Sequence, residues 1–163
     1  MRQTAVTCVA SLFAFGLLAL AQPPSSDPKL RAATAAAIQE ARSLRKIQES
    51  LSIAMADNKA TPAMLAERIA ATGKSLQSLQ DSIDKIDEQY ESLSEDHQSA
   101  VREAWSLAKL FGVLFEHLQE SAAKPDSAER RQDLISDCGS TARRAVMLDE
   151  TLSRLNSGAR PRG

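Results

Sequence analysis

Glycine, proline and aromatic residues are scarce in this chain of 163 residues. It contains six glycines, six prolines, four phenylalanines, one tryptophan and one tyrosine. β-Sandwiches are rich in turn residues and in aromatic and β-branched strands, so this composition disfavours them. Alanine, leucine, serine, glutamate and arginine dominate instead, and most of these residues are compatible with helix. The composition therefore predicts an all-α fold.

Cysteine and an excess of charge of one sign are also lacking. The chain has two cysteines, and its 20 Lys and Arg residues nearly balance 21 Asp and Glu residues, for a formal net charge of −1. Without a basic excess the chain cannot hold nucleic acid by counterion release, so no nucleic-acid partner is expected. Cys8 lies in an N-terminal apolar run. If that run is removed, Cys138 has no partner within the chain, and the fold must rely on its packed core.

The long apolar run is confined to the N-terminus. Arg2 is the only charge before Asp27, and residues 5–21 are apolar or small throughout. Ala19 and Ala21 stand at −3 and −1 of a small-residue cleavage site. This arrangement is typical of a secretory signal peptide.

Cleavage after Ala21 would make the protein exported, and periplasmic or secreted. The alternative is an N-terminal membrane anchor. However, the run is near the lower limit of about 20 apolar residues for a spanning helix, and no cluster of Lys or Arg follows it. We therefore expect residues 1–21 to be removed and no stable membrane span to remain. Residues 22–27 would form a linker and residues 157–163 a flexible tail.

Helix start signals divide the rest of the chain into four segments of similar length. Asp27 and Thr61 each stand before a proline that would occupy the first helical position. Asp126, with Glu129 three residues later, resembles a capping box. The predicted bundle domain, residues 28–156, contains helices at about 28–56, 62–93, 95–123 and 126–156.

Each segment has apolar residues at alternating steps of three and four, the heptad spacing of helices that pack as in coiled coils. The pattern is clearest from Leu65 to Leu93. Segments of about 30 residues would each be about 45 Å long, which predicts an up-down-up-down four-helix bundle. The predicted core positions of the first segment are Leu30, Ala33, Ala37, Glu40, Leu44, Ile47, Leu51 and Ala54. The third segment adds a second apolar row at Leu107, Leu110 and Leu114.

The boundary between the second and third segments is ambiguous, because residues 91–101 hold no glycine or proline. Ser92 with Glu95 resembles a capping box, and we expect a turn at residues 94–97. The heptad pattern can also continue in phase. One helix over about 62–122 would then form a long helical hairpin or coiled coil that has to dimerise. We favour the turn and a monomer, because four equal helices bury every apolar face within one chain.

No motif for catalysis or for a cofactor is evident. The Gly-x-Ser-x-Gly motif and phosphate-binding glycine loops are absent. Covalent haem needs Cys-x-x-Cys-His, and a di-iron bundle site needs Glu-x-x-His pairs, and neither occurs. His97 falls in the expected turn, and His117 falls off the main core positions of its segment. We therefore predict a protein that is not an enzyme and that holds no cofactor or metal.

Acidic residues concentrate along the second segment and the expected turn. One interpretation is a docking surface for a basic partner or for loosely held cations. The alternative, which we favour, is a solvated helix face that pairs with Lys29, Arg31 or Arg102. The candidate partner surface consists of Asp81, Asp84, Asp87, Glu88, Glu91 and Glu95.

Gly112 and Gly139 fall in helix interiors, where each costs about 1 kcal/mol relative to alanine. We favour close approach of the third and fourth helices at these glycines, because protein interiors pack without large voids. The alternative is a gap that takes a small apolar ligand. That candidate apolar pocket would be lined by Phe111, Gly112, Phe115, Cys138 and Gly139.

Together these features favour an exported, non-catalytic helical bundle that binds another macromolecule in the envelope or outside the cell. That partner would be an unidentified protein or another component of the envelope. A carrier of a small hydrophobic ligand is the first alternative, and a metal- or haem-binding bundle is a weaker one.

The cleavage site gives the first testable prediction. Because Ala19 and Ala21 fit the small-residue rule, the protein isolated from the exported fraction of its source should begin at Gln22. Its denatured mass and its N-terminal peptide check this directly. A mass that still includes residues 1–21 would instead indicate a retained membrane anchor.

Overall fold

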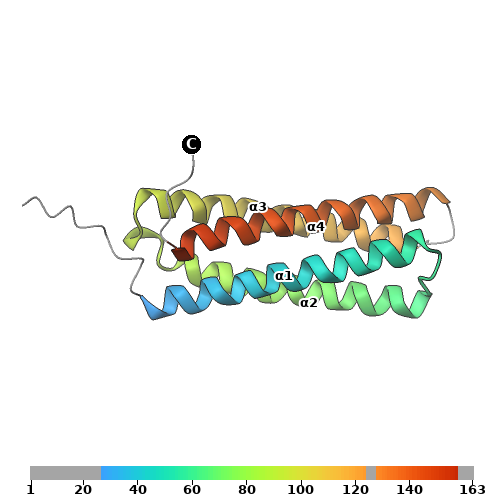
Figure 1. Cartoon of the computed structure of the whole chain (residues 1–163), viewed down its shortest axis with the longest axis horizontal. Helices are drawn as coiled ribbons and strands as arrows, with labels where there is room; N and C mark the ends of the chain where they lie inside the picture. The colour runs from blue at the N-terminus through green and yellow to red at the C-terminus, as the bar shows by residue number, and fades with distance from the viewer. Residues whose placement is uncertain (1–26, 124–127, 158–163) are drawn as a thin grey trace, which may run out of the picture.

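The computed structural model describes residues 27–123 and 128–157. Within them the chain forms four long α-helices that pack against one another (Figure 1). The prediction of an all-α bundle of four helices is confirmed. The expected signal peptide, residues 22–26 of the linker, the cap at Asp126 and residues 158–163 of the tail lie outside the described residues. The helices are α1 (Pro28–Ala56), α2 (Pro62–Asp87), α3 (Glu95–Ala122) and α4 (Ala128–Ser157), with a short 3₁₀ helix, η1 (Tyr90–Ser92), before α3.

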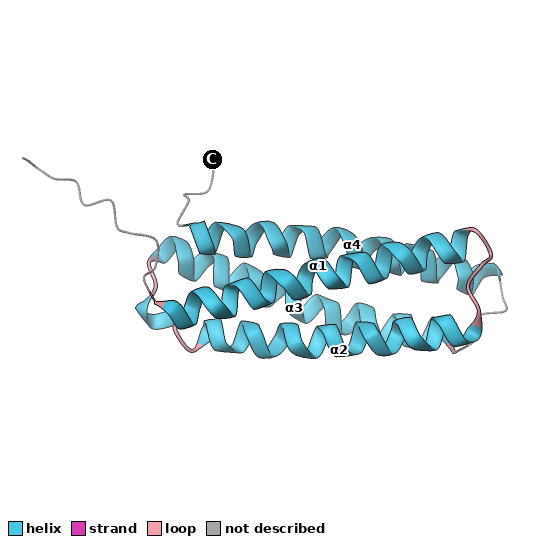
Figure 2. Cartoon of the chain, turned by 60° about the horizontal axis from the view of Figure 1, so that its bottom comes forward, coloured by secondary structure: helices cyan, strands magenta, loops and turns pink. Residues whose placement is uncertain are grey.

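The four helices run alternately in opposite directions along one long axis (Figure 1). α1 contacts both α2 and α4, and α3 closes the ring by contacting α4 and α2 (Figure 2). The contact between α1 and α4 is the most extensive, and that between α2 and α3 is the least. The described chain therefore starts and ends at the same end of the bundle.

Side chains cap the helix starts where the sequence predicted them. The Asp27 carboxylate accepts a hydrogen bond of 2.8 Å from the Lys29 amide, and the Thr61 hydroxyl accepts one of 3.2 Å from the Met64 amide. Such caps satisfy amides that have no partner within their own helix. The chain leaves α1 at Asn58, whose φ of 56° is a left-handed conformation that asparagine tolerates.

The turn between α2 and α3 lies earlier than the sequence indicated. α2 ends at Asp87 rather than near residue 93, and the cap of α3 is Ser94, whose hydroxyl accepts from the His97 amide at 3.4 Å. The predicted capping box at Ser92 is therefore wrong, and His97 lies in the first turn of α3. The alternative of one continuous helix over 62–122 is wrong for the same reason, because residues 88–94 interrupt it.

The core consists of two clusters along the bundle. The larger one draws on all four helices and contains Leu44, Leu79, Phe111 and Leu148 among its fully buried members. Tyr90 and the nearby Leu93 continue the heptad pattern past the end of α2, and both pack against this larger cluster. The smaller cluster lies toward the end of the bundle where α1 connects to α2. It contains Leu51, Met55, Leu65, Leu118, Leu134 and Cys138.

In α1 the buried residues follow a different heptad phase from the predicted one. Ala41, Gln48 and Met55 are buried where the pattern predicted Glu40, Ile47 and Ala54. The hydrophobic pattern predicted the wrong positions because two core positions of α1, Thr34 and Gln48, hold polar side chains. The buried residues of α1 are Leu30, Ala33, Thr34, Ala37, Ala41, Leu44, Gln48, Leu51 and Met55.

Those polar core residues are hydrogen-bonded. The Thr34 hydroxyl donates to the Leu30 carbonyl at 2.8 Å within α1. Gln48, which is fully buried, donates from Nε2 to the Thr72 hydroxyl of α2 at 2.8 Å. Its other amide atom, Oε1, is buried without a described hydrogen-bond partner. One inter-helix hydrogen bond is therefore fixed inside the α1–α2 contact.

The close helix approach is made by a glycine other than those the sequence suggested. A Cβ at Gly73 of α2 would come within 2.9 Å of the Phe115 ring of α3. A Cβ at Gly112 would meet nothing within 4 Å, and one at Gly139 would meet only Arg143 of its own helix, at 3.5 Å. The expectation of close approach at Gly112 and Gly139 is wrong, because both face away from the neighbouring helices.

This contrast can be tested with two alanine substitutions. Gly112→Ala should raise the free energy of unfolding by about 0.5–1 kcal/mol, because alanine is the better helix former and the site is open. Gly73→Ala should lower it by about 1 kcal/mol or more, because the new methyl overpacks against the Phe115 ring. Urea unfolding followed by circular dichroism measures both. Adding Phe115→Leu to Gly73→Ala should recover part of the loss, and equal gains from both alanines would contradict the close approach.

Candidate functional site

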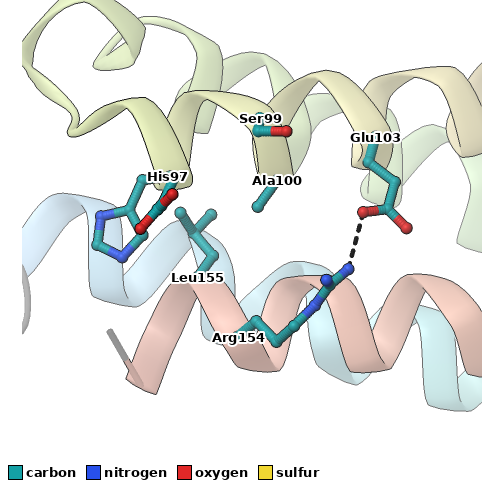
Figure 3. Close-up of a pocket in the computed structure, with 7 residues that line it drawn as sticks. His97, Ser99, Ala100, Glu103, Arg154 and Leu155 are labelled. Atoms are coloured by element: carbon teal, nitrogen blue, oxygen red, sulfur yellow. Dashed lines mark hydrogen bonds and ion pairs between the residues drawn. The ribbon is translucent and has the colours of Figure 1, made fainter. Parts of the chain in front are cut away.

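A shallow pocket lies between the start of α3 and the end of α4. Its volume is about 130 Å³, and Ala100 and Leu155 supply its apolar lining (Figure 3). The rim is polar and charged. We refer to this set as the end pocket: Asp96, His97, Ser99, Ala100, Glu103, Arg154 and Leu155.

An ion pair crosses from α3 to α4 at the rim of the end pocket. Arg154 Nη2 lies 2.7 Å from Glu103 Oε2 and also donates to the Thr151 hydroxyl at 3.0 Å (Figure 3). The two charged side chains are about half exposed, so the pair contributes little to stability, and its main effect is to orient them. Among the described residues, no hydrogen bond joins Ser99 to His97.

Exposed apolar side chains continue from the end pocket along the same two helices. Leu110 and Val113 of α3 are 46% and 53% exposed, and Met147 of α4 is 49% exposed. Leu110 follows Glu103 by seven residues, and Met147 precedes Arg154 by seven. Because the helices are antiparallel and Glu103 pairs with Arg154, Leu110 and Met147 lie on the same side of the α3–α4 contact, about two turns further along each helix. We call Leu110, Val113 and Met147 the apolar edge.

The sequence pattern only partly anticipated this arrangement. Leu107, Leu110 and Leu114 form the predicted second apolar row, but Leu107 is buried, Leu114 is half-buried and Leu110 is exposed. No sequence pattern indicated that Met147 would be exposed or that the end pocket would form, because both depend on how α3 and α4 are aligned. That alignment is visible only in the folded chain.

Two other exposed apolar residues lie elsewhere. Trp105 is 40% exposed and has the Lys109 ammonium 3.6 Å from its ring centroid, in a cation–π contact. Ile53 of α1 is 63% exposed and lies near the opposite end of the bundle from the end pocket. Ile53 is thus a convenient control for the apolar edge.

All six carboxylates of the candidate partner surface are exposed. Asp81 accepts from Gln77 at 2.9 Å and Asp84 accepts from Gln80 at 2.7 Å, each within α2. Among the ion pairs of the described residues, none involves these six side chains. Arg102, an expected partner, instead donates to the Tyr90 hydroxyl and lies over its ring. The surface consists of Asp81, Asp84, Asp87, Glu88, Glu91 and Glu95.

The residues of the candidate apolar pocket lie in different surroundings. Phe111 is buried in the larger core cluster, whereas Cys138 is buried in the smaller one with Phe115 packed against it. Gly112 is on the exposed face of α3, and Gly139 is half-buried. The structure therefore places the aromatic rings and the thiol in packed core rather than side by side around the two glycines.

Burial and charge contacts shift the pKa values of Arg42, Asp137 and Cys138. Hydrogen bonds to Asp149, at 2.7 and 3.1 Å, raise the pKa of Arg42 and join α1 to α4. Partial burial raises the pKa of Asp137, an effect that His117 opposes. Burial, together with the nearby Asp137 charge, raises the pKa of the Cys138 thiol to about 12. No group of three or more His, Cys, Asp and Glu side chains in the described residues is arranged to hold a metal ion.

Comparisons with known proteins add no relative. No protein-family model, no curated protein and no solved structure matches this chain. Among the helices of the described residues, none combines the length and the apolar character needed to cross a bilayer. The candidate site is therefore defined by its geometry alone.

The buried thiol gives a prediction that also tests the core. A pKa of about 12, against an ordinary value of 9.0, leaves Cys138 about a thousandfold less thiolate at neutral pH than an unfolded chain has. Maleimide labelling of Cys138 should therefore be at least that much slower in the native protein than in urea. Mass spectrometry of the peptide that contains Cys138 measures the rate. Fast native labelling, or a disulfide-linked dimer, would contradict the burial of this residue.

Proposed function

We propose that this chain is an exported, non-catalytic helical bundle that acts by binding another macromolecule in the envelope or outside the cell. The apolar edge is the observation on which this proposal rests. Of the five large apolar side chains that are exposed in the described residues, four lie on α3 and α4. Three of these four, Leu110, Val113 and Met147, form the edge.

Exposed apolar groups that cluster in one place indicate a binding surface rather than a chance distribution. Scattered single apolar side chains are normal on a protein surface, whereas neighbouring ones gain free energy when a partner removes them from water. Burial of apolar area contributes roughly 25 cal/mol per Å². Leu110 and Met147 come from two neighbouring helices and lie on the same side of their contact, so a partner could cover them together.

The polar surroundings support the same interpretation. Protein interfaces combine an apolar centre with a charged rim that adjusts specificity and association rate. The end pocket supplies such a rim through Asp96, Glu103 and Arg154. Neither the sequence motifs nor the end pocket positions a nucleophile with its base, so binding accounts for these features more simply than catalysis does. The export signal is the basis for placing this binding outside the cytoplasm.

Photo-crosslinking in the source cell tests the proposal without assuming what the partner is. A benzophenone amino acid at position 110 should give a discrete covalent adduct in the exported fraction, because the partner covers this side chain. The same group at position 53 is the matched control, since Ile53 is even more exposed but lies away from the edge. Immunoblotting detects the adducts. Failure to obtain adducts at position 110, or the same adducts at both positions, would contradict binding through the apolar edge.

A further inference from the structure

The end pocket and the apolar edge lie on one line along the bundle. On α3, residues 96, 99, 103, 106, 110 and 113 follow one another at steps of three or four, so they share one edge of the helix. On α4, Met147 precedes Arg154 by seven residues, so it lies on the same side of the α3–α4 contact as Leu110. From Ala100 to Val113 this line is about 20 Å long, at 1.5 Å per residue.

We propose that this line is the docking site for an amphipathic α-helix of a partner protein that carries an apolar stripe flanked by Lys and Arg. The proposal rests on the proposed function and specifies its partner. One apolar side chain of the partner would enter the end pocket between Ala100 and Leu155. Others would cover Leu110 and Met147, and the basic residues would lie beside Asp96 and Glu103.

The spacing of the two apolar positions fits a helix. Ala100 and Leu110 are ten residues apart on α3, or about 15 Å. A partner helix that lies alongside has stripe residues at i, i+3, i+7 and i+10 or i+11, which reproduces this distance. A partner in extended conformation would be held mainly by backbone hydrogen bonds to the edge of a sheet, and this all-helical surface offers none.

The charges around the line determine which charge is expected on the flanks of the partner helix. At the end pocket, Asp96 of α3 and the nearby exposed Glu150 of α4 add to the paired Glu103 and Arg154, whereas Arg143 and Arg144 lie further along α4, one turn before Met147. Glu95, next to Asp96, is also exposed. A basic flank on the partner therefore gains favourable contacts near the end pocket, whereas an acidic flank meets like charge.

Designed peptides test the occupant directly. The probe is a synthetic peptide of about 18 residues in which leucines recur at i, i+3, i+7 and i+10 among lysines, which gives a striped basic helix. One matched control has the same composition in scrambled order, and a second keeps the stripe but has glutamate in place of lysine. The reporter is the methyl NMR signal of Met147, since the buried Met55 provides an internal reference in the same spectrum.

We expect the striped basic peptide to shift the Met147 signal and to leave the Met55 signal in place. Leu110→Glu should weaken binding by about tenfold or more, whereas Ile53→Glu should leave it unchanged. Both substitutions are at exposed positions, so circular dichroism should show both variants folded. A peptide titration followed by NMR gives the affinities.

Three results would overturn the proposal. They are equal binding of the scrambled peptide, equal loss with Ile53→Glu, and a shift of the Met147 signal on dilution of the protein alone. The first would leave only non-specific charge attraction, and the last would make a second copy of this chain the occupant. If crosslinking at position 110 succeeds while the striped peptide fails, the proposed function stands and only the basic helical partner is wrong. If crosslinking fails as well, both are wrong.

Discussion

The packing of α1 against α4 and α2 is the contact on which the rest of the bundle depends. Small side chains make it possible, since Ala37 and Ala41 are completely buried and allow the neighbouring helices to approach closely. The larger Leu44 and Leu51 then fill the space about one and three turns beyond Ala41. α1 thus has two extensive neighbours, whereas α3 is held mainly by α4. The helix least enclosed by its neighbours is also the one that carries most of the exposed apolar side chains.

This unequal enclosure links the fold to the proposed function. A helix that packs on two sides buries a wide apolar face, while one that packs mostly on one side leaves part of that face in water. α3 is the most apolar helix, and Trp105, Leu110 and Val113 are the large apolar side chains that its neighbours leave exposed. The core makes the bundle stable through α1, and α3 supplies the surface on which a partner can act.

Periodicity and capping were enough to predict the class of fold and the starts of α1 and α2. Asp27 and Thr61 act through local hydrogen bonds, which depend only on neighbouring residues. The heptad phase of α1 was wrong because Thr34 and Gln48 are buried polar residues, whose partners lie within α1 or on α2. The close approach at Gly73 was missed because it depends on Phe115, a residue distant in sequence. The end pocket and the apolar edge were not predictable for the same reason, since they arise from the alignment of α3 with α4.

The buried amide of Gln48 has a further consequence for how the chain reaches this arrangement. Alanines and leucines repeat along α1 and α2 at heptad spacing, so sliding one helix past the other by seven residues would still match apolar rows. In the native alignment Gln48 Nε2 meets the Thr72 hydroxyl. A shift by one heptad in either direction would place Gln48 opposite Leu65 or Leu79, which offer it no hydrogen bond. An unpaired buried amide costs about 1–3 kcal/mol, so a single polar side chain selects one alignment among several that hydrophobic burial alone would tolerate.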